Sequence, residues 1–254
     1  MINEELYKTI FTRKSVRKYD MTSLTDEKLL EIKDFADNVK QLIPGIKCEF
    51  SFLTDDKVKN ILPIKAPHYI LIYSEKKEAY LLNAGFMLQQ VDLYLSSINL
   101  GSCWLGMAKP SKEVPTMQNG LEFVIMLAFG NTKEELHRAD NSEFKRKSIS
   151  EITSISGADQ LLEAARLAPS ASNSQPWYFS GNTNEIIICR EKLSLLKAPL
   201  YNKMNQIDIG IALYHLLLSI EHHGKTACFD YTNSNAPKGY EFMLKVKVEE
   251  NASC

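Results

Sequence analysis

The most informative part of the chain is Ala168-Pro169-Ser170-Ala171-Ser172-Asn173-Ser174-Gln175-Pro176-Trp177. It follows a helix-like stretch that ends at Leu167, and its two prolines cannot continue a helix. Hydroxyl and carboxamide side chains lie between the prolines, and an apolar strand resumes at Trp177, which we expect in the core. A segment of this composition can hold a polar, planar ligand.

A second motif lies near the amino terminus and reads Arg13-Lys14-Ser15-Val16-Arg17. In an extended backbone alternate side chains point to the same side, so Arg13, Ser15 and Arg17 would share one face. Two guanidinium groups with a hydroxyl between them predict a phosphate cradle.

Composition narrows the classes of function. The chain has 254 residues, 24% of them charged, and a formal net charge of -1. Such a balance gives no reason to expect a nucleic acid or a membrane surface as partner. The longest apolar run, Phe123 to Phe129, is too short to span a bilayer. We expect a cytoplasmic protein with a small-molecule substrate.

Several kinds of site are excluded by their missing patterns. No His-Glu-x-x-His motif and no nucleophile elbow is present, so the sequence predicts neither a metal site nor a catalytic triad. Gly101 to Gly106 is not a P-loop, because Met107-Ala108 stands where Lys-Ser or Lys-Thr is required. The cysteines are scattered, which predicts reduced thiols: Cys48, Cys103, Cys189, Cys228 and Cys254.

The two halves of the chain echo each other, which predicts an internal duplication with lobes at 1–135 and 136–254. Five matches occur in the same order in both halves. They are Phe11 to Val16 with Phe144 to Ile149, Leu29-Leu30-Glu31 with Leu161-Leu162-Glu163, Lys65-Ala66-Pro67 with Lys197-Ala198-Pro199, Cys103-Trp104 with Cys228-Phe229, and Gly120 to Phe123 with Gly239 to Phe242.

Apolar periodicity predicts long buried helices at Glu78 to Ile98 and Asn205 to His223, closed by Gly101 and Gly224 in the left-handed conformation. The fold class is therefore α+β. The strands are expected at 48–53, 68–73, 102–105, 121–130, 177–180, 185–190, 226–231 and 241–248.

Together the two motifs resemble the flavin-binding signature of the nitroreductase superfamily, an Arg-x-Ser-x-Arg/Lys strand and a Pro-Ser-x-x-Asn-x-Gln-Pro-Trp loop. The resemblance implies a nitroreductase-like fold and FMN. Nitroreductases are usually homodimers whose flavin sites use both subunits, so the duplicated chain resembles such a dimer fused into a monomeric pseudo-dimer. One FMN per chain is expected, because 42–48 lacks the Ser, Asn and Gln of the loop and Ser150 replaces the second arginine.

The resemblance also assigns residues to the FMN. Arg13, Ser15 and Arg17 would meet the phosphate, and Arg17 could instead reach the ribityl chain or the pyrimidine edge. Gln175 would tie the loop to itself. The other implied contacts are the loop Pro169, Ser170, Ala171, Ser172 and Asn173, the strand Trp104-Leu105-Gly106 near flavin N5, and Arg146 at the phosphate. Two plainer readings stay open: the loop as a simple turn, and Lys145 to Lys147 as a solvated charge run.

The implied function is an FMN-dependent oxidoreductase. NADH or NADPH would pass hydride to flavin N5, and a nitroaromatic or quinone acceptor would take it, with no catalytic side chain. Other readings are a flavin-binding or sensing protein without turnover, an oxidase, dehalogenase or flavin-cleaving enzyme on the same scaffold, and a cofactor-free structural relic.

Overall fold

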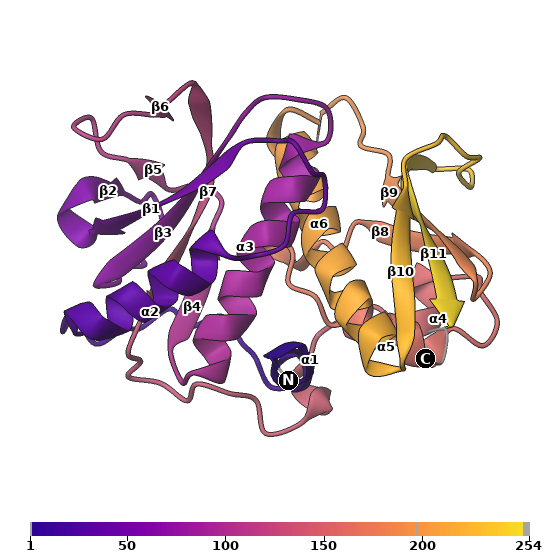
Figure 1. The fold of residues 1–254 in the computed structure, drawn as a ribbon, viewed down its shortest axis with the longest axis horizontal. Helices are drawn as coiled ribbons and strands as arrows, with labels where there is room; N and C mark the ends of the chain where they lie inside the picture. Colours follow the sequence, from indigo (N-terminus) through magenta and orange to yellow (C-terminus); the bar gives the residue numbers. More distant parts are fainter. Residues whose placement is uncertain (1, 197, 251–254) are drawn as a thin grey trace. The chain divides into compact units, whose positions relative to one another are not determined.

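The computed structural model describes residues 2–196 and 198–250, which form two compact units (Figure 1). The N-terminal unit is Thr12–Asn141, and the C-terminal unit combines Met1–Phe11 with Ser142–Cys254. Lys197, part of one repeat match, and Cys254 lie outside the described residues. The four described cysteines are free thiols, as expected.

The N-terminal unit is built on an antiparallel sheet in the order β1-β3-β7-β4. Its strands are β1 (Cys48–Thr54), β3 (His68–Ser74), β4 (Gly101–Leu105) and β7 (Leu121–Gly130), and β6 (Met117–Gln118) pairs with β7. All seven residues of β3 are buried, which suits its continuous apolar run. A separate ribbon joins β2 (Val58–Lys59) to β5 (Lys109–Pro110) after the 3₁₀ turn η1 (Asp55–Lys57).

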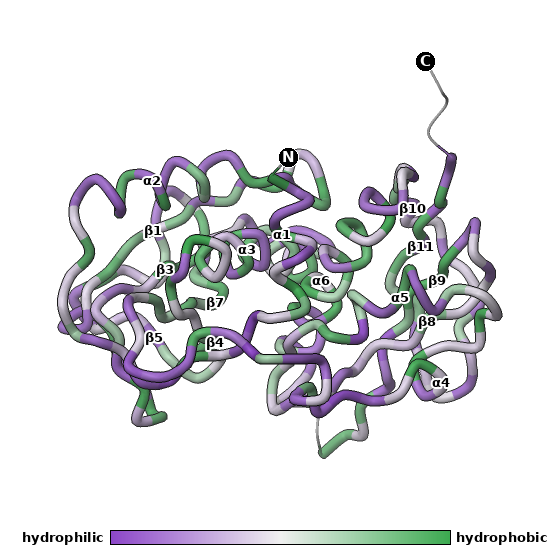
Figure 2. Tube along the Cα trace, turned by 90° about the horizontal axis from the view of Figure 1, so that it is seen from below, coloured by the Kyte–Doolittle hydropathy of each residue, from purple (hydrophilic) through white to green (hydrophobic). Residues whose placement is uncertain are grey.

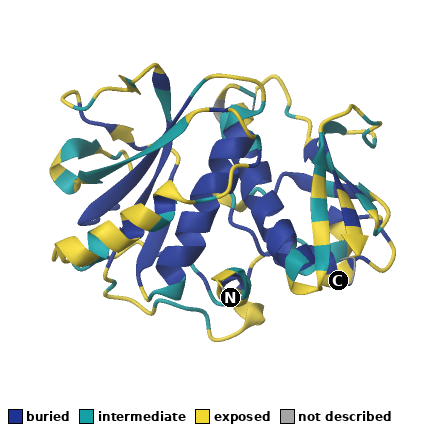
Figure 3. Cartoon of the chain, in the orientation of Figure 1, coloured by how far each residue is buried: buried dark blue, intermediate teal, exposed yellow. Residues whose placement is uncertain are grey.

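Helix α3 (Tyr80–Ser97) is the central helix of this unit. Its residues from Leu81 to Ser96 are all buried, so it is dark blue along its length in Figure 3. A helix that is apolar on most faces must be enclosed on most faces. By contrast, α2 (Asp26–Asp37) buries only Ile32 and Ala36, and hydrophilic and hydrophobic residues alternate along it in Figure 2.

The C-terminal unit is built on a second antiparallel sheet, in the order β10-β11-β9-β8. Its strands are β8 (Trp177–Gly181), β9 (Glu185–Glu191), β10 (Lys225–Asp230) and β11 (Tyr240–Glu250). The long helix α6 (Ala198–His222) connects β9 to β10 and packs against α5 (Asp159–Arg166). The short elements η2 (Asn141–Glu143), α4 (Ile149–Ile152) and η3 (Ala171–Asn173) complete the series.

The two sheets have the same connectivity. In each, the first two strands in sequence are neighbours, a long buried helix follows, and the fourth strand then lies between the second and the third. This matches β1, β3, α3, β4 and β7 of one unit to β8, β9, α6, β10 and β11 of the other.

The structure draws the unit boundaries differently from the lobes expected at 1–135 and 136–254. Helix α1 (Ile2–Ile10) packs against α6 of the C-terminal unit, with Leu6 and Ile10 buried. Asn3 donates a hydrogen bond of 2.6 Å to Glu221 in α6. The pattern of an amphipathic helix predicts an apolar face but does not indicate which element that face packs against. The sequence therefore did not predict that α1 belongs to the C-terminal unit.

The α+β class is confirmed, and every expected strand and long helix is present. Helix α6 begins at Ala198, seven residues before the expected start, because Pro199 falls in its first turn, where no N–H is needed. The structure describes no helix that is both long enough and apolar enough to cross a membrane.

One expected helix terminator is wrong. Gly224 does have a left-handed φ of 71°, but after α3 that conformation belongs to Asn99, with φ 61°. Gly101 is the first residue of β4, where a Cβ would lie 2.9 Å from Cβ and Cγ1 of Val16. Gly101 is therefore required for close packing rather than for helix termination.

We predict that Gly101→Ala lowers the free energy of unfolding by about 1–3 kcal/mol, because the added methyl overpacks the contact with Val16. Denaturant titration measures the change. The same substitution should cost less in a Val16→Ala background, which opens space at the contact. An equal cost in both backgrounds would show that Val16 is not the cause.

Candidate functional site

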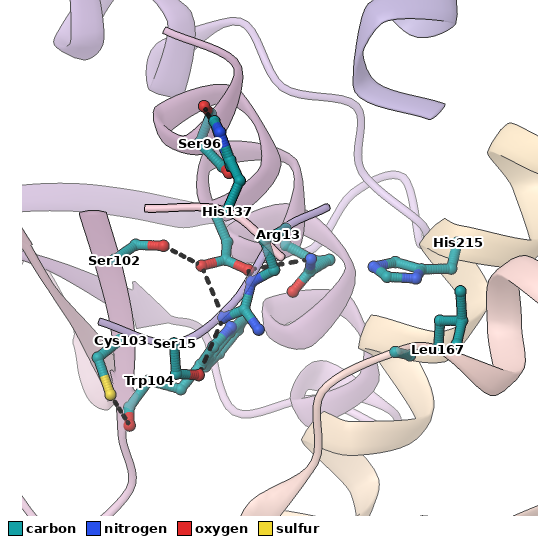
Figure 4. Close-up of polar contacts among 12 residues, drawn as sticks. Arg13, Ser15, Ser96, Ser102, Cys103, Trp104, His137, Leu167 and His215 are labelled. Atoms are coloured by element: carbon teal, nitrogen blue, oxygen red, sulfur yellow. Dashed lines mark hydrogen bonds and ion pairs between the residues drawn. The ribbon is translucent and has the colours of Figure 1, made fainter. Parts of the chain in front are cut away.

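The segment 13–17 of the N-terminal unit runs extended beside β4. Ser15 forms a parallel bridge with Ser102, and the N–H of Val16 donates to the Ser102 carbonyl at 2.9 Å. Nη2 of Arg13 lies 3.4 Å from Oγ of Ser15 (Figure 4). The expected common side of these two alternating positions is therefore confirmed.

Arg13 forms a buried ion pair with Asp92 of α3, which the sequence did not predict. Its Nε lies 2.7 Å from Oδ2 of Asp92, and its Nη2 lies 3.2 Å from Oδ1. The two side chains are 4% and 0% exposed. Ser102 donates to Asp92 at 2.5 Å and Gln89 donates at 3.1 Å. The charge of Arg13 is thus balanced inside the unit.

Arg17 is the exposed cation of the motif. The carboxylate of Glu134 accepts the backbone N–H groups of Arg17 and Lys18, each at 2.9 Å, and so holds the backbone here. Burial raises the pKa of the Cys103 thiol, while the positive charges of Arg17 and Arg13 oppose that rise. Both arginines therefore lie near Cys103 of β4, and Arg17 presents its charge at the surface.

Trp104 and Leu105 are the last two residues of β4, the outermost strand of its sheet, and Gly106 follows them. Leu105 is buried, Trp104 is half-buried, and Gly106 is in the exposed turn that follows. Nε1 of Trp104 is buried, and within the described residues it has no hydrogen-bond acceptor. A buried N–H of this kind is suited to a ligand with polar acceptor atoms.

In the C-terminal unit, the loop after α5 has an unusual backbone. Ser172, Asn173 and Gln175 have φ values of 52°, 55° and 49°. Non-glycine residues in this left-handed region are destabilised by roughly 1–2 kcal/mol each. Hydrogen bonds within the loop offset this strain. The Gln175 N–H donates to Oγ of Ser170 at 2.9 Å, and the Gln175 amide donates to the Asn173 carbonyl at 3.1 Å, which confirms that Gln175 ties the loop to itself.

Arg146 anchors this loop instead of forming part of a solvated charge run. It donates to the Ala168 and Leu167 carbonyls at 3.1 and 3.3 Å and to Oδ1 of Asn173 at 2.5 Å. Asn173 in turn donates to the Lys145 carbonyl at 2.7 Å. The structure therefore joins the basic cluster to the loop. The sequence expected their polar groups to face the flavin, whereas here they bind each other.

Asp208 of α6 is a second residue that sequence reasoning missed. Its Oδ1 accepts the N–H of Ala171 at 3.0 Å. Burial raises the pKa of Asp208 to about 8, opposed by the hydrogen bond from Ala171. The only signal in the sequence is a lone carboxylate in an apolar helix, and Asp92 in α3 gives the same signal.

Trp177 is 1% exposed, so its predicted place in the core is confirmed. We expected its indole N–H to be paired, but among the described residues it has no acceptor. Ser172 is exposed, and the hydroxyl of Ser170 faces into the loop as an acceptor. Of the expected loop contacts, Ser172 and Asn173 are exposed, and the Asn173 side chain is held by Arg146 and the Lys145 carbonyl.

Residues 5–220 match the model of a family described as "Putative TM nitroreductase". The crystal structure of a putative nitroreductase from Thermotoga maritima is similar, with 20% identity, a TM-score of 0.64, and coverage of 97% of this chain and 94% of that chain. This likeness shows a shared fold.

Two further structures are more distant. A nitroreductase family protein from Clostridium difficile 630 has 21% identity and a TM-score of 0.46, covering 58% of this chain and 94% of that chain. An FMN-dependent nitroreductase from Clostridium difficile R20291 has 20% identity and a TM-score of 0.44, covering 57% and 97%. No protein with a curated description matches the sequence.

We predict that Arg13→Ala destabilises the protein by about 3–5 kcal/mol, because it leaves the Asp92 carboxylate buried without its partner. Lys14→Ala is the matched control. Its Nζ lies 3.9 Å from Glu135, which is 92% exposed, so its loss should cost less than about 1 kcal/mol. Equal costs in denaturant titration would contradict the structural role of the Arg13 pair.

Proposed function

The chain belongs to this nitroreductase family, and we propose that it is an FMN-dependent oxidoreductase that uses NADH or NADPH to reduce nitroaromatic or quinone-type acceptors. One observation carries the proposal. The loop that resembles the flavin loop of the family is held in a strained backbone, by Arg146 and Asp208, with the Ser172 hydroxyl exposed. Strain of this kind concentrates at ligand sites.

For the phosphate, the residues that fit are Ser15 and Arg17. A hydroxyl donor and an exposed guanidinium match the oxygen atoms and the charge of a phosphate monoester. Arg13 supports them indirectly, because it contacts Ser15 while its charge is matched by Asp92. We therefore assign the direct contacts to Ser15 and Arg17 and a positioning role to Arg13.

For the ring, the residues that fit come from two segments. Nε1 of Trp104 is a buried donor without an acceptor in the described chain, and Leu105 and Gly106 lie on the outermost strand and the turn after it. In the C-terminal unit, Pro169, Ser170, Ala171 and Ser172 would face the ring. Arg146 and Asn173 would hold this loop in shape through their mutual hydrogen bond.

When bound, FMN would supply the hydride chemistry between the nicotinamide and the acceptor. The chain's own residues would bind and orient the cofactor, so no acid–base side chain is required. In this proposal, phosphate recognition depends on Arg17, and ring recognition depends on the loop.

We further propose that the chain is an internal duplication with one FMN. The shared connectivity of the two sheets supports the duplication. In the C-terminal unit, the segment that matches the phosphate motif has Ser148 and Ser150 where the motif has Ser15 and Arg17. The two hydroxyls lie 3.1 Å apart in a hydrogen bond, and Ser148 forms a capping box with Glu151. These hydroxyls lack the second guanidinium that a phosphate would need. A monomer with one flavin is expected by light scattering and absorbance, and a ratio near two would contradict it.

We predict that Arg17→Ala weakens FMN binding by about tenfold or more, because a charge-assisted hydrogen bond to the phosphate is lost. Titration of FMN fluorescence measures the affinity. Lys18→Ala is the control, since Lys18 is an adjacent exposed cation whose backbone N–H also donates to the Glu134 carboxylate. If both variants bind FMN as the wild type does, the phosphate assignment is wrong.

The visible absorption spectrum of the purified protein, before and after anaerobic NADPH or NADH, tests the function itself. A flavin spectrum that bleaches on addition of the nicotinamide is the expected result. A yellow protein that does not bleach would point to flavin binding without turnover. A colourless protein that takes up no added FMN would overturn the proposal.

A further inference from the structure

Asp208 is a buried carboxyl group with one oxygen in use. It is 3% exposed, and its Oδ1 accepts the N–H of Ala171. Its Oδ2 is buried as well, and within the described residues nothing hydrogen-bonds to it. Leaving a buried polar atom unpaired is costly, so an atom in this state beside a strained loop indicates that a ligand supplies its partner.

The corresponding side chain in the N-terminal unit has hydrogen-bond partners for all of its polar atoms. Asn83 of α3 holds the segment before β1, as Asp208 of α6 holds the segment before β8. Oδ1 of Asn83 accepts from Leu42 at 2.9 Å and from Ile43 at 3.1 Å. Its amide nitrogen lies 3.4 Å from the sulfur of Cys48. Asn83 therefore uses both ends of its side chain, whereas Asp208 uses one.

The surroundings of Asp208 favour the neutral acid. A buried carboxylate needs compensating donors, and the single N–H of Ala171 does not suffice, so burial raises the pKa to about 8. Several charged groups on the elements packed against α6 form ion pairs. These are Glu4 of α1 with His222, Glu163 of α5 with Arg166, Arg190 of β9 with Glu241, and Asp230 of β10 with Lys245.

Resting on the proposed function, we propose that Asp208 binds the flavin as a neutral carboxylic acid. Its Oδ1 fixes the peptide of Ala171, and its Oδ2–H donates a hydrogen bond to an acceptor atom of the FMN that this loop covers. A neutral donor of this kind adds no negative charge beside a ring that becomes electron-rich on reduction.

Three variants test the proposal through FMN affinity, measured by fluorescence titration at neutral pH. Asp208→Asn keeps an acceptor for Ala171 and an N–H donor, so it should bind FMN within about threefold of the wild type. Asp208→Leu has neither and should bind about tenfold more weakly or worse. Ser219→Ala is the control, because it removes a buried hydrogen bond from the same helix, to Gln160, away from the loop. It should lower the melting temperature without changing FMN affinity.

A stability measurement tests the neutral state without flavin. In the unfolded chain Asp208 loses its proton near pH 4, whereas in the folded protein it keeps the proton up to about pH 8. The folded wild type therefore holds the extra proton, and it should lose stability relative to Asp208→Asn as pH rises through this window. The difference in melting temperature between the wild type and Asp208→Asn should change in favour of the variant between about pH 4 and pH 8 and should stay constant at higher pH. A gap that does not change with pH overturns the neutral acid.

The two proposals fail in different ways. Wild type that binds no FMN overturns the proposed function and with it the flavin contact, while the stability measurement still decides the protonation state. Wild type that binds FMN, together with an Asp208→Leu variant of equal affinity, overturns this inference alone. Loss of affinity in Ser219→Ala would mean that destabilisation, not the carboxyl contact, explains the result.

Discussion

The buried ion pair between Arg13 and Asp92 is the contact on which the candidate phosphate segment depends. A carboxylate in the middle of an enclosed helix is stable only if it is paired and hydrogen-bonded, and Arg13, Ser102 and Gln89 supply those bonds. Arg13 is also the first residue of the extended segment beside β4. The pair therefore fixes the positions of Ser15 and Arg17 relative to that strand. The first role of the motif is to hold this segment in place.

This division of labour follows from burial. The Arg13 guanidinium neutralises a buried carboxylate and has little charge left for an anion. The exposed guanidinium of Arg17, four residues later, keeps its charge but has no fixed place of its own. Alternation along the extended segment links the two, because Arg13 and Ser15 lie on one side and Glu134 holds the backbone at Arg17. In the proposed phosphate site, the charge and the positioning would thus come from different residues of one short motif.

Local patterns predicted most of the fold. Apolar runs and helical periodicity placed β3, β7 and α3 within two residues of their observed bounds, and they placed the end, but not the start, of α6. The predictions failed where a contact with a distant part of the chain determines the local structure. Gly101 is constrained by Val16, and α1 packs on α6. The loop and the basic cluster of the candidate site were visible as motifs. The residues that anchor them, Asp92 and Asp208, could not be predicted, because a single carboxylate in a helix gives no indication of which group it binds.

The two units show how one architecture can carry a closed and an open version of the same contact. In each, a side chain from the long buried helix accepts backbone N–H groups of the segment that precedes the first strand. At Asn83, both the oxygen and the nitrogen of the side-chain amide have hydrogen-bond partners, so the segment needs no ligand to complete the contact. With a carboxyl at Asp208, one oxygen remains, and the loop it holds contains left-handed residues that packing alone does not favour. If the proposed duplication and the single FMN site hold, one copy keeps a strained contact with an unpaired oxygen for the ligand, and the other copy, which would bind no ligand, satisfies its contact completely.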